Sequence, residues 1–229
     1  MVRRQVSTAH VSSKLRPPTR WERAYQAFET PLEERKKFIG RYRSIGADGW
    51  SRDLRLLEVC SGRGSGLHAW QAMGFRRVFG VDCSPALVLA QDTPGFRIIG
   101  DARSLPLASN CVDVVVVQGG LHHLLTTEDV DRALAEMCRV VVPSGTIVII
   151  EPWLTPFLRV VHAVCGSELA RRVWSRIDAL ATMIEEERET YYRWLNAPDE
   201  HLLVIRRRVV ARIVRRRWGK LVYVGTPIP

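Results

Sequence analysis

The chain has no long hydrophobic run, although apolar residues make up 46% of its 229 residues. A helix that spans a bilayer shows about 18 or more consecutive apolar residues, so no transmembrane segment is expected. The segment 1–20 is basic, but it lacks the apolar stretch of a secretory signal. We therefore expect a cytoplasmic protein that begins with a flexible basic tail over residues 1–20.

Cysteine is scarce and scattered. The five cysteines are odd in number, and no two of them have the C-x-x-C spacing. Disulfide scaffolds and zinc sites usually place cysteines in closely spaced pairs. We therefore expect neither a disulfide framework nor a bound metal ion.

Acidic residues are outnumbered, since 24 Asp and Glu oppose 34 Lys and Arg and give a net charge of +10. Arginines concentrate near both ends, including 206–208 and 215–217. An excess of positive charge attracts nucleic acid, anionic lipid or phosphorylated substrates. A solvated basic face is the simpler explanation, because charge governs solubility and association rather than fold. Nucleic acid is therefore kept as an alternative partner and is not the favoured one.

Short apolar runs alternate with helical stretches between residues 54 and 152. Runs rich in Val and Ile that are separated by helices are typical of a parallel sheet covered on both faces. The predicted strands are Leu54–Cys60, Arg77–Val81, Phe96–Ile99, Val112–Val117 and Thr146–Ile150. Three helices are predicted among these strands. One follows the first strand and ends at Met73, and the others span Pro85–Gln91 and Glu128–Arg139.

Helices flank this core on both sides. One is predicted over Trp21–Phe28, and a second starts at a capping box from Thr30 to Glu33 and stops at Gly46. After residue 152 the pattern predicts helices over 156–165 and 168–194, then strands near 204–214 and 221–225.

Together these patterns predict an α/β fold: a doubly wound, Rossmann-like, mostly parallel seven-stranded sheet with a helical cap insertion before the last two strands. We expect the insertion to lie on the substrate side. The predicted organisation is a tail (1–20), N-terminal helices packing on the core (21–50), a cofactor-binding core (51–152), the cap insertion (153–200) and the terminal strands (201–229).

A glycine-rich turn follows the first strand of the core. The segment Leu56–Gly66 contains Gly62, Gly64 and Gly66 between a strand and a helix. Glycine lets the backbone approach a ligand closely, and the helix start offers free N–H groups. A nucleotide-like ligand is therefore expected here, although a structural tight turn is the alternative.

Acidic residues end the next two strands, at Asp82 and Asp101. An acid at the first position can accept hydrogen bonds from both ribose hydroxyls of an adenosine. Asp101 and the backbone N–H of Ala102 would face an adenine edge if the sheet is doubly wound. The alternatives are a helix cap for Asp82 and a turn former for Asp101. Because both acids and the glycine turn converge on one crevice, we favour a ligand site.

The motifs E-V-C-S-G-R-G-S-G, G-V-D, G-D-A-R-S-L-P-L and R-V-V-V-P-S-G-T occur in that order. Together they resemble class I S-adenosylmethionine-dependent methyltransferases. The similarity is to the small-molecule, methyltransferase type 11-like branch, which includes ubiquinone and menaquinone enzymes, and it covers roughly residues 54–152. It implies S-adenosyl-L-methionine as the cofactor. NAD is the runner-up, but its fingerprint is G-x-G-x-x-G, whereas the glycines here run G-x-G-x-G.

The resemblance also implies which residues bind this cofactor. Glu58 stands where the family usually has aspartate, and with Gly62 and Gly64 it would shape the methionine end. Asp82 would hold the ribose. The full expected cofactor set is Glu58, Gly62, Gly64, Asp82, Cys83, Asp101, Ala102 and Gln118.

The loop after the fourth strand, from Gln118 to Leu124, is expected to face the methyl group in this fold. A neutral imidazole is a suitable general base near pH 7, so His122 or His123 could deprotonate an acceptor. Capping and packing are the alternative roles. Glu151 ends the fifth strand and could bind or deprotonate the acceptor, or pair with a cap arginine.

The predicted function is transfer of a methyl group to an oxygen or carbon atom of a small-molecule acceptor, with His122, His123 and Glu151 as the candidate catalytic residues. An RNA methyltransferase and a non-catalytic cofactor-binding scaffold are the alternatives. The acids in 185–189 are expected on a solvated helix face. The aromatic residues in 191–194 would line an acceptor pocket or attach the cap to the sheet.

Overall fold

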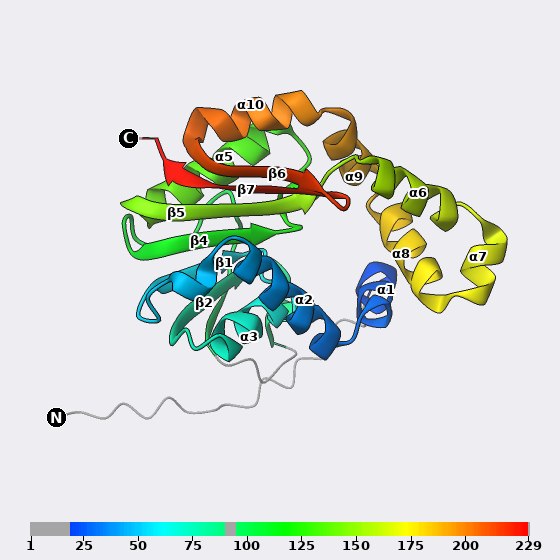
Figure 1. The fold of residues 1–229 in the computed structure, drawn as a ribbon, viewed down its shortest axis with the longest axis horizontal. Coiled ribbons are helices and arrows are strands. Elements are labelled where there is room, and N and C mark those ends of the chain that lie inside the picture. Colours follow the sequence, from blue (N-terminus) through cyan, green and yellow to red (C-terminus); the bar gives the residue numbers. More distant parts are fainter. Residues whose placement is uncertain (1–18, 90–94, 229) are drawn as a thin grey trace.

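The structure is a computed structural model that describes residues 19–89 and 95–228. Its seven strands form one sheet in the order β3-β2-β1-β4-β5-β7-β6 (Figure 1). The strands are β1 (Arg55–Val59), β2 (Arg77–Asp82), β3 (Phe96–Ile99), β4 (Val112–Gln118), β5 (Val141–Pro152), β6 (Val209–Arg217) and β7 (Lys220–Pro227).

Neighbouring strands pair in parallel across β3, β2, β1, β4 and β5. Strand β7 lies antiparallel to both β5 and β6. The continuous valine run of β4 is buried on both faces of the sheet, as such a run requires. The predicted α/β fold with a mostly parallel seven-stranded sheet is therefore confirmed. Strand order reverses between β1 and β4, which is where ligands bind in open sheets of this kind.

Helices cover both faces of the sheet. One core cluster joins α2 and α3 to the sheet through Tyr42, Leu67 and Trp70. The other joins α5 and α10 through residues such as Leu134 and Ile205. These helices are α2 (Pro31–Ser44), α3 (Ser65–Ala72), α4 (Pro85–Leu89), α5 (Thr127–Val140) and α10 (Pro198–Arg208). Of the helix predicted over 85–91, the last two residues lie outside the described residues.

Both amino-terminal helices begin with a capping box. Thr19 and Glu22 start α1 (Arg20–Phe28), and Thr30 and Glu33 start α2 as predicted. Residues 1–18 of the predicted tail lie outside the described residues. Whereas α2 packs on α3 at the sheet, α1 packs on α8 (Ser175–Glu186) of the insertion. We expected both helices to pack on the core; α1 packs mainly on the insertion and reaches the core through Tyr25.

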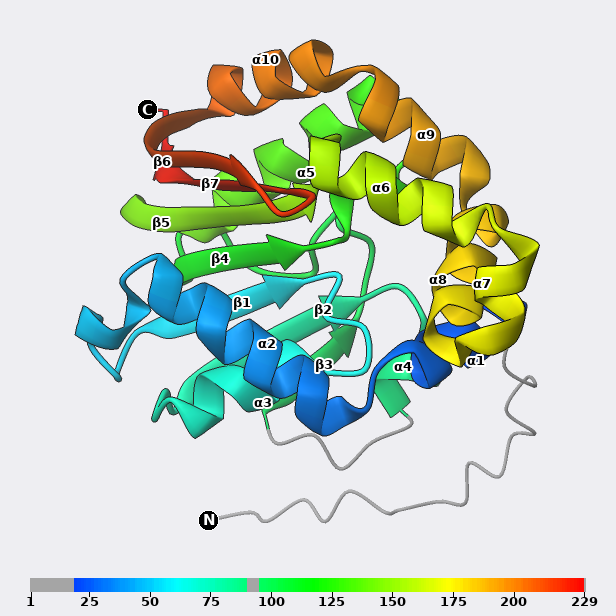
Figure 2. The ribbon, with the colours of Figure 1, turned by 45° about the vertical axis from the view of Figure 1, so that its right-hand side comes forward.

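The insertion after β5 consists of α6 (Pro156–Cys165), α7 (Glu168–Val173), α8 (Ser175–Glu186) and α9 (Arg188–Asn196). Figure 2 shows it with α1 on the side toward which the β1, β2 and β4 arrows point. The prediction of one helix over 168–194 was wrong, because the backbone leaves helical geometry at Trp174 and Glu187. These two breaks fold the insertion back on itself.

The strand predicted from residue 204 was also placed too early. Residues 198–208 form α10, and β6 starts at Val209. The apolar residues Leu202 and Ile205 are three apart, so both face α5 from one side of a helix. The strand predicted over Thr146–Ile150 starts earlier, because residues 143–145 lie inside β5, where its pairing register with β4 shifts.

In the described part of the chain, no helix has both the length and the apolar character needed to cross a bilayer.

Candidate functional site

The glycine turn after β1 has the backbone that its sequence predicted. Gly62 and Gly64 have φ angles of +52° and +80°, and Cys60 before them is also left-handed at +56°. Only glycine adopts such angles without strain. Gly64 is the N-cap of α3, so the free backbone N–H groups of that helix start lie at the turn.

Glu58 is buried beside this turn, with 3% of its surface exposed. Its Oε2 atom has no hydrogen-bond partner among the described residues. Burial raises the pKa of this carboxyl from 4.5 to about 8, against the opposing effect of nearby Gln118. A buried carboxyl with a free oxygen fits the positively charged amino group of the expected cofactor. Glu58 therefore passes the test of fit for the methionine end.

Asp82 connects the end of β2 to the glycine turn. The N–H of Gly62 donates to its Oδ2 at 2.7 Å, and the N–H of Ser84 donates to its Oδ1 at 2.9 Å. Ser84 itself caps α4, because its Oγ accepts from the N–H of Leu87. The alternative role of Asp82 as a helix cap is therefore taken by Ser84. Cys83, the next residue in the expected set, is exposed.

Asp101 lies in a turn after β3 and accepts hydrogen bonds from Arg103, including one from the backbone N–H at 2.8 Å and one from Nη2 at 2.7 Å. These bonds lower the pKa of the Asp101 carboxyl. Arg103 also reaches Asp129 on α5. The alternative role of Asp101 as a turn former thus has direct support. Ala102 is buried beside it, and the adenine contact stays a prediction.

The amino-terminal helices cover the glycine turn. The Tyr25 hydroxyl would be 3.6 Å from a Cβ at Gly62. The guanidinium of Arg63 lies over the Tyr25 ring at 4.6 Å and its Nε donates to Glu34 at 2.8 Å. Arg63 and Glu34 are 4% and 5% exposed. The sequence did not predict this buried ion pair, which attaches α2 to the turn.

Gln118, at the end of β4, is oriented from α2. Its Nε2 donates to the Tyr42 hydroxyl at 2.5 Å, and its Oε1 accepts from Arg41 at 3.4 Å. Because Gln118 also affects the pKa of Glu58, it lies next to the expected methionine end. Contact of Gln118 with the cofactor stays a prediction.

Half-buried cations collect near the carboxyl end of the sheet. Burial, together with repulsion from Arg41 and Lys37, lowers the pKa of Lys220 to about 7. Burial also lowers the pKa of Arg41, and burial with repulsion from Arg41 lowers that of Lys37. Lys37 pairs with Glu29. Among the described residues, neither Arg41 nor Lys220 has an acidic side chain within ion-pair distance. This part of the site therefore has an unbalanced positive charge that the sequence did not reveal.

His122 and Glu151 form a buried pair. The Nδ1–H of His122 donates to Glu151 Oε2 at 2.8 Å, and the backbone N–H groups of Gly120 and Leu121 donate to Oε1 at 2.8 and 2.9 Å. The alternative that Glu151 pairs with a cap arginine was therefore wrong, because its carboxylate is occupied within the β4 loop. Burial lowers the pKa of His122, but the Glu151 and Glu187 carboxylates outweigh it and raise the value to about 9.

Glu187 joins this pair from the insertion. Its Oε2 lies 3.7 Å from His122 Nε2, and its Oε1 lies 3.1 Å from His123 Nδ1. The expectation of a solvated face was wrong for Glu187, whose side chain is only 18% exposed. The reason is the break between α8 and α9, which turns it toward the β4 loop. Its place in the chain, far from the histidines, gave no signal of this contact.

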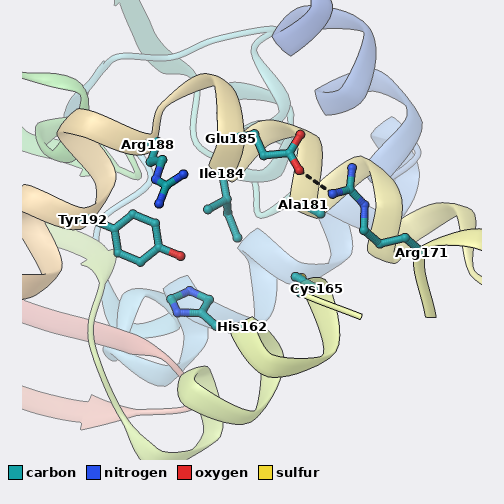
Figure 3. Close-up of a pocket in the computed structure, with 9 residues that line it drawn as sticks. His162, Cys165, Arg171, Ala181, Ile184, Glu185, Arg188 and Tyr192 are labelled. Carbon is teal, nitrogen blue, oxygen red and sulfur yellow. Dashed lines mark hydrogen bonds and ion pairs between the residues drawn. The ribbon is translucent and has the colours of Figure 1, made fainter. Parts of the chain in front are cut away.

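A cavity of about 340 Å³ lies between α6, α8 and α9 (Figure 3). Tyr192 lines it, together with His162 and Arg188. The His162 ring is hydrogen bonded to the Tyr191 hydroxyl at 2.9 Å, and the Tyr191 ring packs edge-on against His122. Of the predicted aromatic set, Tyr192 lines a cavity, whereas Trp194 is buried and donates to the Pro152 carbonyl.

Comparison with known proteins agrees with this geometry. Residues 57–149 match the family model described as Methyltransferase domain. A ubiquinone/menaquinone biosynthesis C-methyltransferase of Acidiphilium cryptum is 30% identical over 147 residues, covering 59% of this chain and 55% of that protein. A demethylmenaquinone methyltransferase of Renibacterium salmoninarum is 33% identical over 119 residues, covering 49% and 48%. The chain thus spans about half the length of the curated relatives that it matches.

Solved structures share the fold over more of the chain. The PH0226 protein of Pyrococcus horikoshii OT3 has a TM-score of 0.66 at 14% identity, covering 92% of this chain and all of that one. The CurJ carbon methyltransferase has a TM-score of 0.57 at 14% identity, covering 82% and 53%. At these identities the likeness shows the fold alone. The resemblance found in the motifs is confirmed by the family match: residues 57–149 are similar to the methyltransferase domain, and this match supports S-adenosyl-L-methionine as the cofactor.

Proposed function

We propose that the chain is a cytoplasmic enzyme that transfers a methyl group to an oxygen or carbon atom of a small-molecule acceptor. The observation that carries the proposal is the buried Glu58 carboxyl, with its free oxygen, beside the left-handed glycine turn. The acceptor would lie between the β4 loop and the helical insertion, because Glu187 and Tyr191 of the insertion meet His122 there.

The residues that would hold the cofactor divide between its parts. Glu58, Gly62 and Gly64 would bind the methionine end, and Gln118 would lie beside it. Asp82 would accept from the ribose hydroxyls with the lone pairs that its two backbone donors leave free. Asp101 and Ala102, with Cys83 nearby, would border the adenine. When bound, S-adenosylmethionine supplies an electrophilic methyl group on a positively charged sulfur.

The protein's own contribution is alignment and exclusion of water. Tyr25, on α1, covers the glycine turn, since it lies beside Gly62 and under the guanidinium of Arg63. Gln118 is held by Tyr42 and Arg41, so its amide is fixed before any ligand binds. Holding two reactants in line can account for much of the rate of such a displacement.

The unbalanced cations indicate the charge of the acceptor. Arg41 and Lys220 are half-buried and have no acidic partner at ion-pair distance among the described residues, and such a pair would stabilise a negatively charged acceptor oxygen. A hydroxylated aromatic ring that has lost a proton fits this requirement and becomes nucleophilic at both oxygen and ring carbon. The relatives named for ubiquinone and menaquinone biosynthesis support the same acceptor class.

The β4 loop supplies the other groups near the acceptor. Glu151 is a positioning residue, because its carboxylate fixes the ring of His122 and accepts its other hydrogen bonds from two backbone N–H groups of the same loop. His123 is the more accessible histidine, with a side chain 36% exposed. We therefore assign acceptor contact to His122 and His123, and orientation of the loop to Glu151.

The test is transfer of a labelled methyl group from S-adenosylmethionine to a panel of acceptors. The proposal predicts product with a hydroxylated naphthalene or benzene ring and none with its methoxylated or unsubstituted analogue. Label in RNA, with none in any ring acceptor, would contradict it. Cofactor binding without transfer to any acceptor would favour the scaffold alternative.

One observation favours RNA as the second candidate acceptor. Arg217 lies over the exposed Trp218 ring at 5.3 Å, and beside it Arg216 lies over the buried Trp153 ring at 5.4 Å. These pairs follow the carboxyl end of β5, since the Trp153 N–H donates to the Gly219 carbonyl. Arginine with aromatic rings is a common surface for stacked bases. Replacing Arg216 and Arg217 with serine would abolish RNA labelling and spare ring acceptors.

A further inference from the structure

We infer that His122, His123 and Glu187 form a binding site for a divalent transition-metal ion of the zinc class. Each residue offers one ligand atom, and these atoms lie within 4.8 Å of one another. The two histidines come from the loop after β4, and Glu187 comes from the break between α8 and α9. The three side chains therefore meet only because the insertion folds back onto the loop.

The donor set matches the ion. Two imidazole nitrogens and one carboxylate oxygen are the protein ligands of many catalytic zinc sites. A tetrahedral ion with bonds of about 2.0–2.1 Å separates its ligand atoms by roughly 3.3 Å. The 3.1 Å contact joins His123 Nδ1 to Glu187 Oε1, and the 3.7 Å contact joins His122 Nε2 to Glu187 Oε2. With one atom from each residue the three ligand atoms lie within 4.8 Å of one another, so small side-chain rotations would bring them to that spacing. Magnesium prefers oxygen ligands, so it does not fit this set.

Glu151 completes the arrangement from the far side of His122. Its carboxylate accepts the Nδ1–H at 2.8 Å, so Nε2 is the atom left to face Glu187. Metal-binding histidines usually donate their other N–H to a carboxylate or carbonyl, which fixes the tautomer and the ring orientation. Glu151 is itself held by two backbone N–H groups. The His122 ring is therefore already oriented for a metal.

Aromatic rings shield the group on two sides. Tyr191 packs edge-on against His122 at 5.8 Å, and Trp21 packs edge-on against His123 at 5.9 Å. The His122 and Glu187 side chains are 8% and 18% exposed, and His123 is 36% exposed. An ion held here would be screened little by bulk water and would be reached past His123.

An ion at this position would join the insertion to the β4 loop. With three protein ligands, a four-coordinate ion keeps one position for water or for an acceptor oxygen. Binding of the ion does not depend on the proposed methyltransferase function, whereas contact with an acceptor oxygen rests on it. The competing explanation of the cluster is an ion-pair network of two histidines and two glutamates.

The experiment is calorimetric titration of the metal-free full chain with zinc chloride, with magnesium chloride as the control ion. We expect one zinc ion per chain and no magnesium binding. His123→Ala and Glu187→Gln should each weaken zinc binding about tenfold or more. The matched control is His68→Gln, on α3 and outside the cluster, which should bind zinc as the unchanged chain does.

Cobalt(II) provides a second readout, because its visible absorption reports four-coordinate nitrogen and oxygen ligation. Circular dichroism of each metal-free variant confirms that it is folded. Failure of the folded chain to bind zinc, or equal affinity in His123→Ala, Glu187→Gln and the unchanged chain, would overturn the inference. A parallel titration with S-adenosylhomocysteine tests the proposed function separately, since neither result depends on the other.

Discussion

The carboxylate of Glu58 occupies the space that a side chain on Gly66 would need. A Cβ built at Gly66 would lie 2.1 Å from both carboxylate oxygens of Glu58. The end of β1 and the first turn of α3 therefore touch through these two residues. Gly66 is required for packing at this contact, in addition to the left-handed turn made by Gly62 and Gly64.

Replacing Gly66 with alanine should destabilise the protein by about 1–3 kcal/mol, because the added methyl group overpacks a buried carboxylate. The matched control is Gly40→Ala in the exposed part of α2, where a Cβ meets nothing within 4 Å. That substitution should stabilise the helix by about 0.5–1 kcal/mol. Urea denaturation measures both changes, and equal effects of the two substitutions would contradict the packing account.

Glu58 should make the ligand-free protein less stable as pH rises. Its pKa is about 8 in the folded chain against an ordinary value of 4.5, so between these values the folded state keeps a proton that the unfolded state has lost. The free energy of unfolding should fall over this window, by up to about 1.4 kcal/mol per pH unit.

Glu58→Gln should remove that part of the pH dependence. The free energy of unfolding of the variant should therefore equal that of the unchanged chain near pH 4.5 and exceed it increasingly toward pH 8. Denaturation series at several pH values measure it, with Glu168→Gln on α7 as the control that keeps the original slope. A constant difference between Glu58→Gln and the unchanged chain at every pH would refute the buried, protonated carboxyl.

Asp82→Ala should weaken S-adenosylhomocysteine binding by about 1.5–3 kcal/mol, because the ribose hydroxyls lose their acceptor. It should also lower stability, since Gly62 and Ser84 lose theirs. Ser84→Ala separates the two effects, because it removes the α4 cap and leaves the carboxylate in place. Calorimetry should show weakened binding only in Asp82→Ala, and full affinity in that variant would rule out the ribose role.

The buried pair of Arg63 and Glu34 should matter far more than an exposed one. Glu34→Gln leaves a guanidinium uncompensated in a buried position and should cost about 3–5 kcal/mol. The control is Glu189→Gln, which breaks the exposed Glu189–Arg193 pair on α9 and should have little effect. Thermal denaturation of both variants tests this, and similar losses would contradict the role of α2 in closing the turn.

The sequence predicted those parts of the fold that depend on neighbours along the chain. The capping box at Thr30, the glycine turn at Gly62 and Gly64, and the valine run of β4 all carry local signals, and the structure has each of them. The apolar run before β6 was ambiguous, because residues such as Leu202 and Ile205 suit a strand or one face of a helix. These residues form a helix because one helical face packs against α5.

Most of what the sequence missed depends on contacts between distant segments. Glu187 resembled any acid on an exposed helix until the break after α8 turned it toward the histidines. Lys220 stands in a strand with no local sign that Arg41 lies nearby. Such contacts are fixed by how the insertion and the terminal hairpin return to the sheet, which residue spacing does not determine.

The most direct test of the central claim is calorimetric titration of the chain with S-adenosylhomocysteine at pH 7 in two buffers of different ionisation enthalpy. We predict one micromolar site and release of about one proton, because Glu58 must lose its proton to pair with the ligand's ammonium group. Glu58→Gln should release none. Absence of binding in a folded sample, or preference for NAD, would contradict the assignment of this crevice to an S-adenosyl ligand.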